Sequence, residues 1–307
     1  ILAYTSTIVA RSFAFFAGST ILPKIINTTG ELVSNGIGIE GFFQIEIPAM
    51  MGVMTALVTA FVLGLGMSVI KGNIMLSFMQ EFREIIEKVI KYIIIPFLPI
   101  HIAGIFANMA YSGEVAQTLA VFSRVFALVI SLQIIYLIIQ YITAGALAKT
   151  NPFVALKNMI PAYFTAVGTQ SSAATIPVTV NCTKKNNVTD EVADFVIPLC
   201  ATIHLAGSTI TLTICSIAVL GMNGVVLSFA EFLPFIMMLG VTMVAAPGVP
   251  GGAVMAALGL LETMLGFTDG QLALMMALYM AQDSFGTATN VTGDAAIALI
   301  VDKFANK

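Results

Sequence analysis

The chain has 307 residues, of which 58% are hydrophobic and 9% are charged, and its mean hydropathy is +0.99. Soluble domains carry about a quarter charged residues, so this composition excludes a soluble globular fold and predicts a protein of the lipid bilayer. The formal net charge of -3, without a dense basic cluster, excludes a nucleic-acid-binding surface. The cysteines Cys182, Cys200 and Cys215 lack metal-ligand spacing and are predicted to be small, buried hydrophobic residues.

Stretches without Asp, Glu, Lys or Arg predict the membrane-embedded segments, because a spanning helix needs about 20 apolar residues. At least six such segments are expected, at residues 47–70, 92–113, 125–148, 158–183, 195–230 and 232–261. Residues 1–23, interrupted by Arg11, and residues 270–301, interrupted by Asp283 and Asp294, predict two more. Since the chain begins inside an apolar run without a Met or a basic flank, we expect an N-terminal portion to precede it.

The distribution of basic residues predicts the orientation in the membrane. Most of the thirteen Lys and Arg residues fall on one side if residue 1 starts at the cytoplasmic face, and basic loops favour the cytoplasm. We therefore expect a multi-pass protein of the plasma or inner membrane with a cytoplasmic C-terminus. This topology is consistent with the number of apolar segments only if residues 158–183 and 232–261 each enter the membrane and leave it on the same side.

Both of these segments contain a break that suits a re-entrant hairpin. Small residues and a proline occupy residues 168–177 of the first, and glycines and prolines occupy residues 245–252 of the second. Such residues end helices, and non-helical backbone at membrane depth is tolerated only inside protein or beside a water-filled cavity. We expect two re-entrant hairpins, of which the second, with its flexible glycines, is the extracellular gate.

Each expected hairpin is followed by an apolar helix with a polar interruption, at residues 202–209 and 283–294. The hairpins enter from opposite sides, which makes an inverted repeat of the kind that secondary transporters use to place binding sites at broken helices. In the second interruption Asp283, Thr287, Asn290 and Asp294 share one helical face. Charged groups at membrane depth cost roughly 2.5 to 3.5 kcal/mol each, so this face is predicted to bind a ligand rather than only to join helices.

An enzyme and a channel are the competing classes. Asp283 and Asp294 would lie about 16 Å apart along a continuous helix, too far to share a proton as protease aspartates do. His204 has no nucleophile or zinc-ligand pattern beside it. A lone histidine in an apolar run is more often a structural residue held by hydrogen bonds than a catalytic base. A channel can also use re-entrant loops, but two tips from opposite sides fit alternating gates better. We therefore expect a transporter and not an enzyme.

Several motifs resemble the dicarboxylate/amino acid:cation symporter family, which includes the glutamate transporters. Residues 171–179 (SSAATIPVT) resemble the serine-rich first hairpin tip of the family, residues 248–252 (GVPGG) the second tip, and residues 290–294 (NVTGD) the end of the last helix. Residues 4–7 (YTST) are similar to the third family helix, which implies that the first two helices are absent. The implied fold is an all-α polytopic membrane protein, an inverted-repeat, elevator-type secondary transporter with two re-entrant helical hairpins.

The resemblance also implies a domain organisation. Residues 1–30 correspond to a helix of the transport domain, residues 31–112 to scaffold helices that trimerise, and residues 113–307 to the rest of the transport domain. The last part would hold helix 6, hairpin 1 at about 152–186, broken helix 7 at about 188–222, hairpin 2 at about 228–264 and helix 8 at about 268–305. The implied partners are an amino acid, sodium, the bilayer and further copies in a homotrimer, with no cofactor besides the coupled ions.

Residue by residue, the resemblance implies a substrate site and sodium sites. The implied substrate-binding residues are Ser171, Ser172, Gly248, Val249, Asp283, Thr287 and Asn290, with Asp283 for the ammonium group and Asn290 with the first tip for the α-carboxylate. The implied sodium ligands are Ser6, Thr7, Thr202, His204, Asn290 and Asp294, with Asp294 as the principal carboxylate.

Departures from the acidic amino acid carriers narrow the substrate. Gly286 stands where those carriers have an arginine for the side-chain carboxylate, and no Lys or Arg lies between Lys185 and Lys303. Ala206, in a segment that resembles Asn-Met-Asp-Gly of the family, replaces a sodium-ligating carboxylate. Residues 206–207 together with 282–284 resemble the bacterial serine/threonine:sodium symporters. We expect a sodium-driven importer of a small neutral amino acid, and the alternative is a proton- or sodium-coupled carrier of acidic amino acids or dicarboxylates.

Overall fold

The computed structural model describes residues 1–26, 51–89, 92–93, 95–111, 115–246 and 248–305, and within these ranges every element of three or more residues is helical. The prediction of an all-α fold is confirmed for this part of the chain. The scaffold segment expected at residues 31–50 lies outside the described residues. The first five helices are α1 (Leu2–Ile25), α2 (Val53–Val69), α3 (Ile74–Val89), α4 (Ile95–Tyr111) and α5 (Val115–Ala148).

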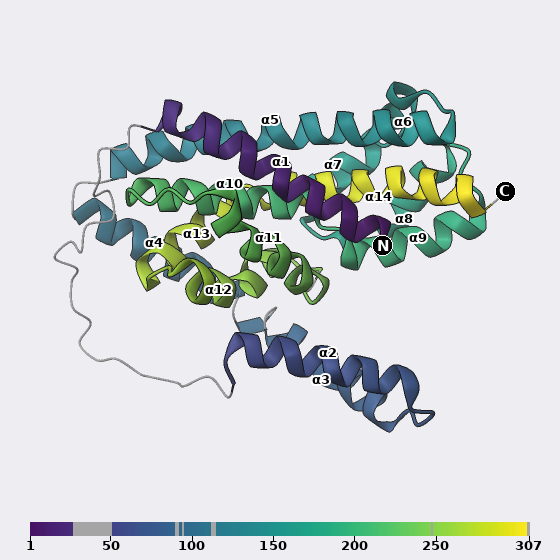
Figure 1. The fold of residues 1–307 in the computed structure, drawn as a ribbon, viewed down its shortest axis with the longest axis horizontal. Helices are drawn as coiled ribbons and strands as arrows, with labels where there is room; N and C mark the ends of the chain where they lie inside the picture. Colours follow the sequence, from purple (N-terminus) through teal and green to yellow (C-terminus); the bar gives the residue numbers. More distant parts are fainter. Residues whose placement is uncertain (27–50, 90–91, 94, 112–114, 247, 306–307) are drawn as a thin grey trace.

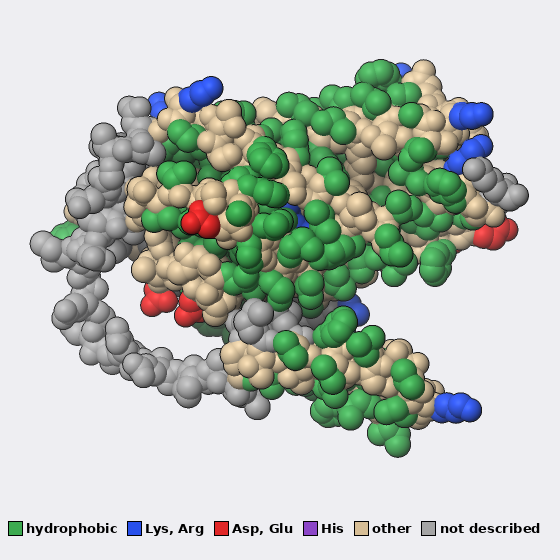
Figure 2. Space-filling model, viewed as in Figure 1, with side chains coloured by type: hydrophobic (Ala, Val, Ile, Leu, Met, Phe, Trp, Pro, Cys, Tyr) green, Lys and Arg blue, Asp and Glu red, His purple; other side chains and the backbone are tan. Residues whose placement is uncertain are grey.

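The surface and the helix lengths are those of a membrane protein. Three described helical stretches are long and apolar enough to cross a bilayer, namely Leu2–Ile25, Leu119–Ala148 and Asp190–Met222. Shorter apolar helices lie at Val58–Val69, Phe229–Val244 and Gly252–Leu265. Hydrophobic side chains cover most of the face in Figure 2, and charged side chains lie mainly towards its ends. The apolar runs in the sequence therefore form apolar helices whose outer faces suit lipid.

The first hairpin is built from short helices with side-chain caps. It comprises α6 (Pro152–Asn158), α7 (Ile160–Thr169) and α8 (Ser172–Lys184). At its tip Gln170 takes a left-handed conformation with φ of 51°, and Ser171 caps α8 by accepting a hydrogen bond from the Ala174 amide at 3.3 Å. The cap satisfies one of the free amides at the start of α8, so the chain reverses without leaving that amide unpaired.

The second hairpin has its tip between α11 (Phe229–Val244) and α12 (Gly252–Leu265). Its outer end is fixed by a capping box between Ser228 and Glu231. Its tip has no side-chain cap, because the residue that precedes α12 is Gly251, which has no side chain. The φ of 73° at Gly251 is a backbone conformation that favours glycine. The two hairpins thus differ in how their tips are held: one by a serine side chain, the other by glycine backbone.

Two broken helices lie between the hairpins and carry most of the buried polar residues. The first consists of α9 (Asp190–Ile203) and α10 (Ala206–Met222), separated by His204 and Leu205. The second consists of α13 (Asp269–Met280) and α14 (Asp283–Ala305), so its break precedes the polar stretch 283–294, which is itself helical. In Figure 1, α10 and α14 run through the middle of the molecule, with α5 above them and α1 running diagonally across them.

Close packing holds the two broken helices together. A Cβ added to Gly207 at the start of α10 would collide with the Gly286 carbonyl oxygen and lie 2.5 Å from Thr289 Cβ in α14. Only glycine at this position lets the two backbones approach so closely. As a result, the beginnings of α10 and α14 meet at the level where both hairpin tips end.

Candidate functional site

A cavity of about 20 Å³ lies where the hairpin tips and the broken helices meet. It has room for about one water molecule. All of the predicted substrate residues except Ser171 line it, namely Ser172, Gly248, Val249, Asp283, Thr287 and Asn290. The other residues of its wall were not among the predicted substrate residues: Gln170, Ala201, Leu205, Ser208, Ala246, Ala253 and Tyr279. Four segments far apart in the chain therefore converge on one small cavity with both polar and apolar lining residues.

Asp283 is the only acidic residue in the cavity wall formed by the described residues. It is 4% exposed, and its Oδ2 accepts a hydrogen bond of 2.7 Å from the Gly251 amide at the tip of the second hairpin. As the first residue of α14 it also lies at the positive end of that helix. A carboxylate held in this way can pair with a cationic group of a ligand while the tip remains closed.

Asn290 joins the two broken helices. Its Oδ1 accepts hydrogen bonds from the amides of Gly207 at 2.7 Å and Ser208 at 3.3 Å, and its Nδ2 donates to Ser208 Oγ at 2.9 Å. These contacts satisfy amides at the start of α10. The amide group keeps a second N–H for a ligand, but its carbonyl oxygen is committed to the protein.

The two hairpin tips touch each other above the cavity. Ser171 Oγ donates a 2.7 Å hydrogen bond to the carbonyl oxygen of Gly248. Gly248 also lies beside Ala173, since an added Cβ would be 3.6 Å from the Ala173 side chain. Ser171 thus closes the cavity rather than lining it, whereas Ser172, buried one residue later, faces the interior.

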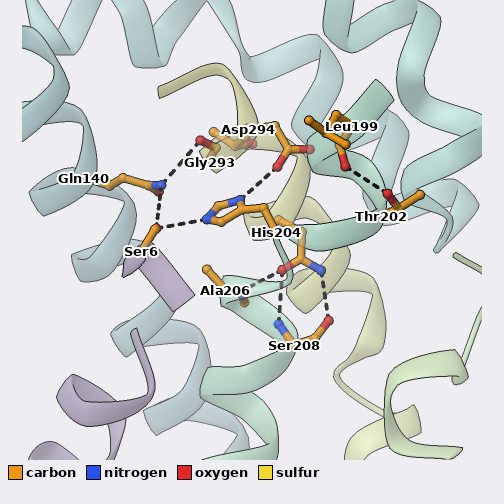
Figure 3. Close-up of polar contacts among 12 residues, drawn as sticks. Ser6, Gln140, Leu199, Thr202, His204, Ala206, Ser208, Gly293 and Asp294 are labelled. Atoms are coloured by element: carbon orange, nitrogen blue, oxygen red, sulfur yellow. Dashed lines mark hydrogen bonds and ion pairs between the residues drawn. The ribbon is translucent and has the colours of Figure 1, made fainter. Parts of the chain in front are cut away.

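A second polar centre surrounds Asp294, and Figure 3 shows its geometry. His204 Nδ1 lies 2.8 Å from Asp294 Oδ1, and His204 Nε2 lies 3.0 Å from Ser6 Oγ. Ser6 also bonds to the Tyr136 hydroxyl at 2.7 Å and accepts from Gln140 Nε2 at 3.2 Å. The imidazole, 1% exposed, therefore bridges α1 and α14 at the break of the first broken helix.

The other predicted sodium ligands lie differently. The Thr7 hydroxyl donates to the Tyr4 carbonyl at 2.8 Å, and the Thr202 hydroxyl donates to the Leu199 carbonyl at 2.9 Å, both within their own helices. In Figure 3, Thr202 lies away from the His204 ring. The structure thus joins Ser6, His204 and Asp294 directly but links neither threonine hydroxyl to them. Asp294 Oδ2 is buried and has no hydrogen-bond partner within the part of the chain that the structure describes.

Sequence reasoning missed the residues that α5 contributes. Gln133, Tyr136 and Gln140 lie three and four residues apart in an otherwise apolar run, which is a helical polar face. Gln133 Nε2 donates to Thr211 Oγ1 at 2.9 Å, so this face packs along α10 and the Asp294 centre. The spacing alone was a usable signal. Tyr279, one turn before Asp283, was missed in the same way.

Arg11 is a buried cation outside the cavity. It is fully buried in α1, and none of its three guanidinium nitrogens has a hydrogen-bond partner among the described residues. The guanidinium packs on α11 at Gly240, where an added Cβ would lie 2.7 Å from Nη1, and it lies 5.9 Å from the centre of the Tyr4 ring. Arg11 does not line the cavity, and among the described residues its wall contains no Lys or Arg.

Comparisons with known proteins give a consistent result. The family described as the sodium:dicarboxylate symporter family matches residues 1–304. An excitatory amino acid transporter of Caenorhabditis elegans is 28% identical over 289 residues, which cover 92% of this chain and 57% of that protein. Human excitatory amino acid transporter 1 is 27% identical over 237 residues, covering 76% of this chain and 43% of the human protein. The chain spans about half the length of the curated relatives it matches.

Proposed function

Because the chain belongs to the sodium:dicarboxylate symporter family, a family of membrane transporters rather than enzymes, we propose that it imports a small neutral amino acid together with sodium. Serine, threonine and alanine are the proposed substrates. In this proposal residues 113–307 and helix α1 move as an elevator against residues 31–112, which hold a homotrimer together in the plasma or inner membrane, with the C-terminus in the cytoplasm.

The single observation that carries the substrate proposal is the charge of the cavity wall. The wall contains the carboxylate of Asp283 and no Lys or Arg among the described residues. An amino acid supplies an ammonium group for Asp283, and its α-carboxylate can use Asn290 Nδ2 and backbone amides of the first tip. A second carboxylate on the substrate would be desolvated without a partner, which costs several kcal/mol.

Acidic substrates remain the second candidate, because the matched relatives are named excitatory amino acid transporters. For this chain an acidic substrate would need a cation, and Arg11 is the one buried Lys or Arg among the described residues. Its guanidinium lies against Gly240, and Arg11 is not part of the cavity wall. The neutral substrate therefore fits the site better.

Sodium coupling is proposed through Asp294. Hard cations favour oxygen ligands, and the unpaired Asp294 Oδ2 lies beside a broken helix whose end carbonyls could complete a site. The His204 contact with Asp294 is the observation that keeps proton coupling as the alternative.

Uptake into proteoliposomes of the full-length protein tests both parts of the proposal. We expect labelled serine to accumulate under an inward sodium gradient, with competition by threonine and alanine and little by aspartate. Displacement by aspartate as strong as by serine would contradict the neutral substrate. Accumulation driven by a pH gradient in sodium-free buffer would contradict sodium coupling. Arg11→Met is the matched variant: aspartate competition that disappears with it would assign the acidic reading to that arginine.

A further inference from the structure

Tyr279 presents a buried hydroxyl that makes no hydrogen bond with another described residue, although the Asp283 carboxylate and the Ser208 hydroxyl lie near it. The residue lies in the last turn of α13 and is 1% exposed. Its hydroxyl oxygen has no hydrogen-bond partner among the described residues. A buried polar group without a partner is costly, and the fold tolerates this one at the wall of the cavity rather than in an apolar core. Such a group is expected to meet its partner when a ligand enters.

The hydroxyl lies near two polar groups of the cavity wall, one at the start of α14 and one at the start of α10. Its neighbours are the carboxylate of Asp283, one helical turn later, and the hydroxyl of Ser208 at the start of α10. Ser208 also borders Gly286, since an added Cβ on Gly286 would lie 3.5 Å from the Ser208 amide nitrogen. Tyr279 and Gly286 are therefore both neighbours of Ser208.

We propose that Tyr279 is the specificity-determining residue of this carrier and that its hydroxyl binds the side-chain hydroxyl of serine or threonine. The inference rests on the proposed function, because it names the group that distinguishes among the small neutral amino acids. A phenol can donate and accept a hydrogen bond and carries no charge. It satisfies a substrate hydroxyl, is left unpaired by a methyl group, and offers no cation to a carboxylate.

The order of preference follows from this chemistry. The side-chain hydroxyl of serine or threonine would form a hydrogen bond with the Tyr279 hydroxyl, whereas the methyl group of alanine would not. Serine and threonine should therefore bind more tightly than alanine. Sites that hydrogen-bond a substrate hydroxyl reject the analogue without it more strongly than apolar pockets reject an added hydroxyl. Aspartate brings a second negative charge next to Asp283, and Tyr279 has nothing to neutralise it.

The test compares Tyr279→Phe with the unchanged full-length protein in two measurements. The first is competition of serine, threonine and alanine against labelled substrate in proteoliposomes. The second is the thermal stability of the purified protein with and without each amino acid, because a ligand that binds the folded state raises the melting temperature. Tyr141→Phe is the matched control: it removes a buried hydroxyl that donates to the Thr292 carbonyl at 2.8 Å, away from the cavity wall.

We expect Tyr279→Phe to reduce the preference for serine over alanine about five- to tenfold, the size of one net hydrogen bond, with alanine affinity little changed. The substrate-free variant should be at least as stable as the unchanged protein, because it loses an unpaired buried group. Tyr141→Phe should lower stability and leave the serine-to-alanine ratio as it was.

Two outcomes would overturn the inference. An unchanged serine-to-alanine ratio in Tyr279→Phe would show that the hydroxyl does not contact the substrate side chain. An equal loss for all three amino acids would show that Tyr279 only positions Asp283. Neither outcome touches the proposed function, which fails instead if aspartate displaces serine from the unchanged protein.

Discussion

Asp283 and Asp294 lie on one face of the same helix, eleven residues apart, and are 4% and 1% exposed, yet their surroundings differ in kind. Asp283 is bonded to the amide of Gly251, which belongs to a hairpin tip. Asp294 is hydrogen-bonded to the imidazole of His204, and the other ring nitrogen of His204 is hydrogen-bonded to Ser6. One carboxylate is bonded to the backbone of a hairpin tip, and the other to a buried side chain.

Under the proposed function, this difference would give the two carboxylates separate tasks. A group whose partner is gate backbone can exchange that partner for a ligand when the tip moves, and a closed tip then reports that the ligand is in place. A group buried with a side-chain partner and one unpaired oxygen can accept a small ion but not an amino acid. In the proposed function, the helix therefore separates the proposed substrate centre from the proposed ion centre by about three turns, and binding at one would bias binding at the other.

The largest effect is expected for Asp294→Asn, which removes the charge from the ion centre and leaves His204 without its carboxylate. Breaking a buried pair costs about 3 to 5 kcal/mol, so sodium-driven uptake should fall more than 100-fold, and sodium should no longer raise the melting temperature. The matched control is Asp302→Asn, on the same helix, where the carboxylate accepts from the Thr189 amide at 2.9 Å. Unchanged sodium-driven uptake in Asp294→Asn would refute the assignment of the ion centre.

Asp283→Asn should change serine binding without changing sodium binding. The substrate ammonium loses its charged partner, which is worth about 1.5 to 3 kcal/mol, so serine should bind roughly 10- to 100-fold more weakly. Stabilisation by sodium alone should persist, because Asp294 and His204 are untouched. Thermal melting with sodium and serine added separately measures both effects. If sodium stabilisation disappeared as well, the two carboxylates would form one site and not two.

Much of this arrangement was accessible from the sequence, and the remainder depended on tertiary contacts. Uncharged runs and their breaks predicted an all-helical membrane transporter with two hairpins. Such features can be read from sequence because apolar runs determine which helices suit a membrane, and Pro or Gly residues determine where helices end. The spacing of Asp283, Thr287, Asn290 and Asp294 predicted that they share one face of a helix, and all four are buried in α14. The partners of these residues could not be read in that way: Asn290 caps α10 and His204 reaches Ser6 across about 200 residues of sequence, and no local pattern encodes which helices meet.

A smaller effect is expected at the tip that holds Asp283. Gly251→Ala places a Cβ at a φ of 73° and 2.8 Å from Met280 Sδ, so it adds a steric contact to a backbone strain of about 1 to 2 kcal/mol. Uptake should slow about tenfold through impaired closure. Gly266→Ala is the matched control, since Gly266 has a φ of 67° with no atom within 4 Å of the added Cβ. Equal slowing in both variants would mean that strain, and not the tip contact, is responsible.

The smallest effect should come from the contact between the tips. Ser171→Ala removes the 2.7 Å hydrogen bond to the Gly248 carbonyl, worth about 0.5 to 1.5 kcal/mol, and weakens the cap of α8. If this bond holds the second tip closed, the variant should release bound serine about three- to tenfold faster, measured by dilution of labelled substrate. Ser228→Ala removes a helix cap of the same kind at the outer end of α11, without touching the tips. Because a cap costs about 1 kcal/mol at either place, faster release in Ser171→Ala alone would isolate the tip contact, whereas equal release rates in the two variants would show that the tips close without it.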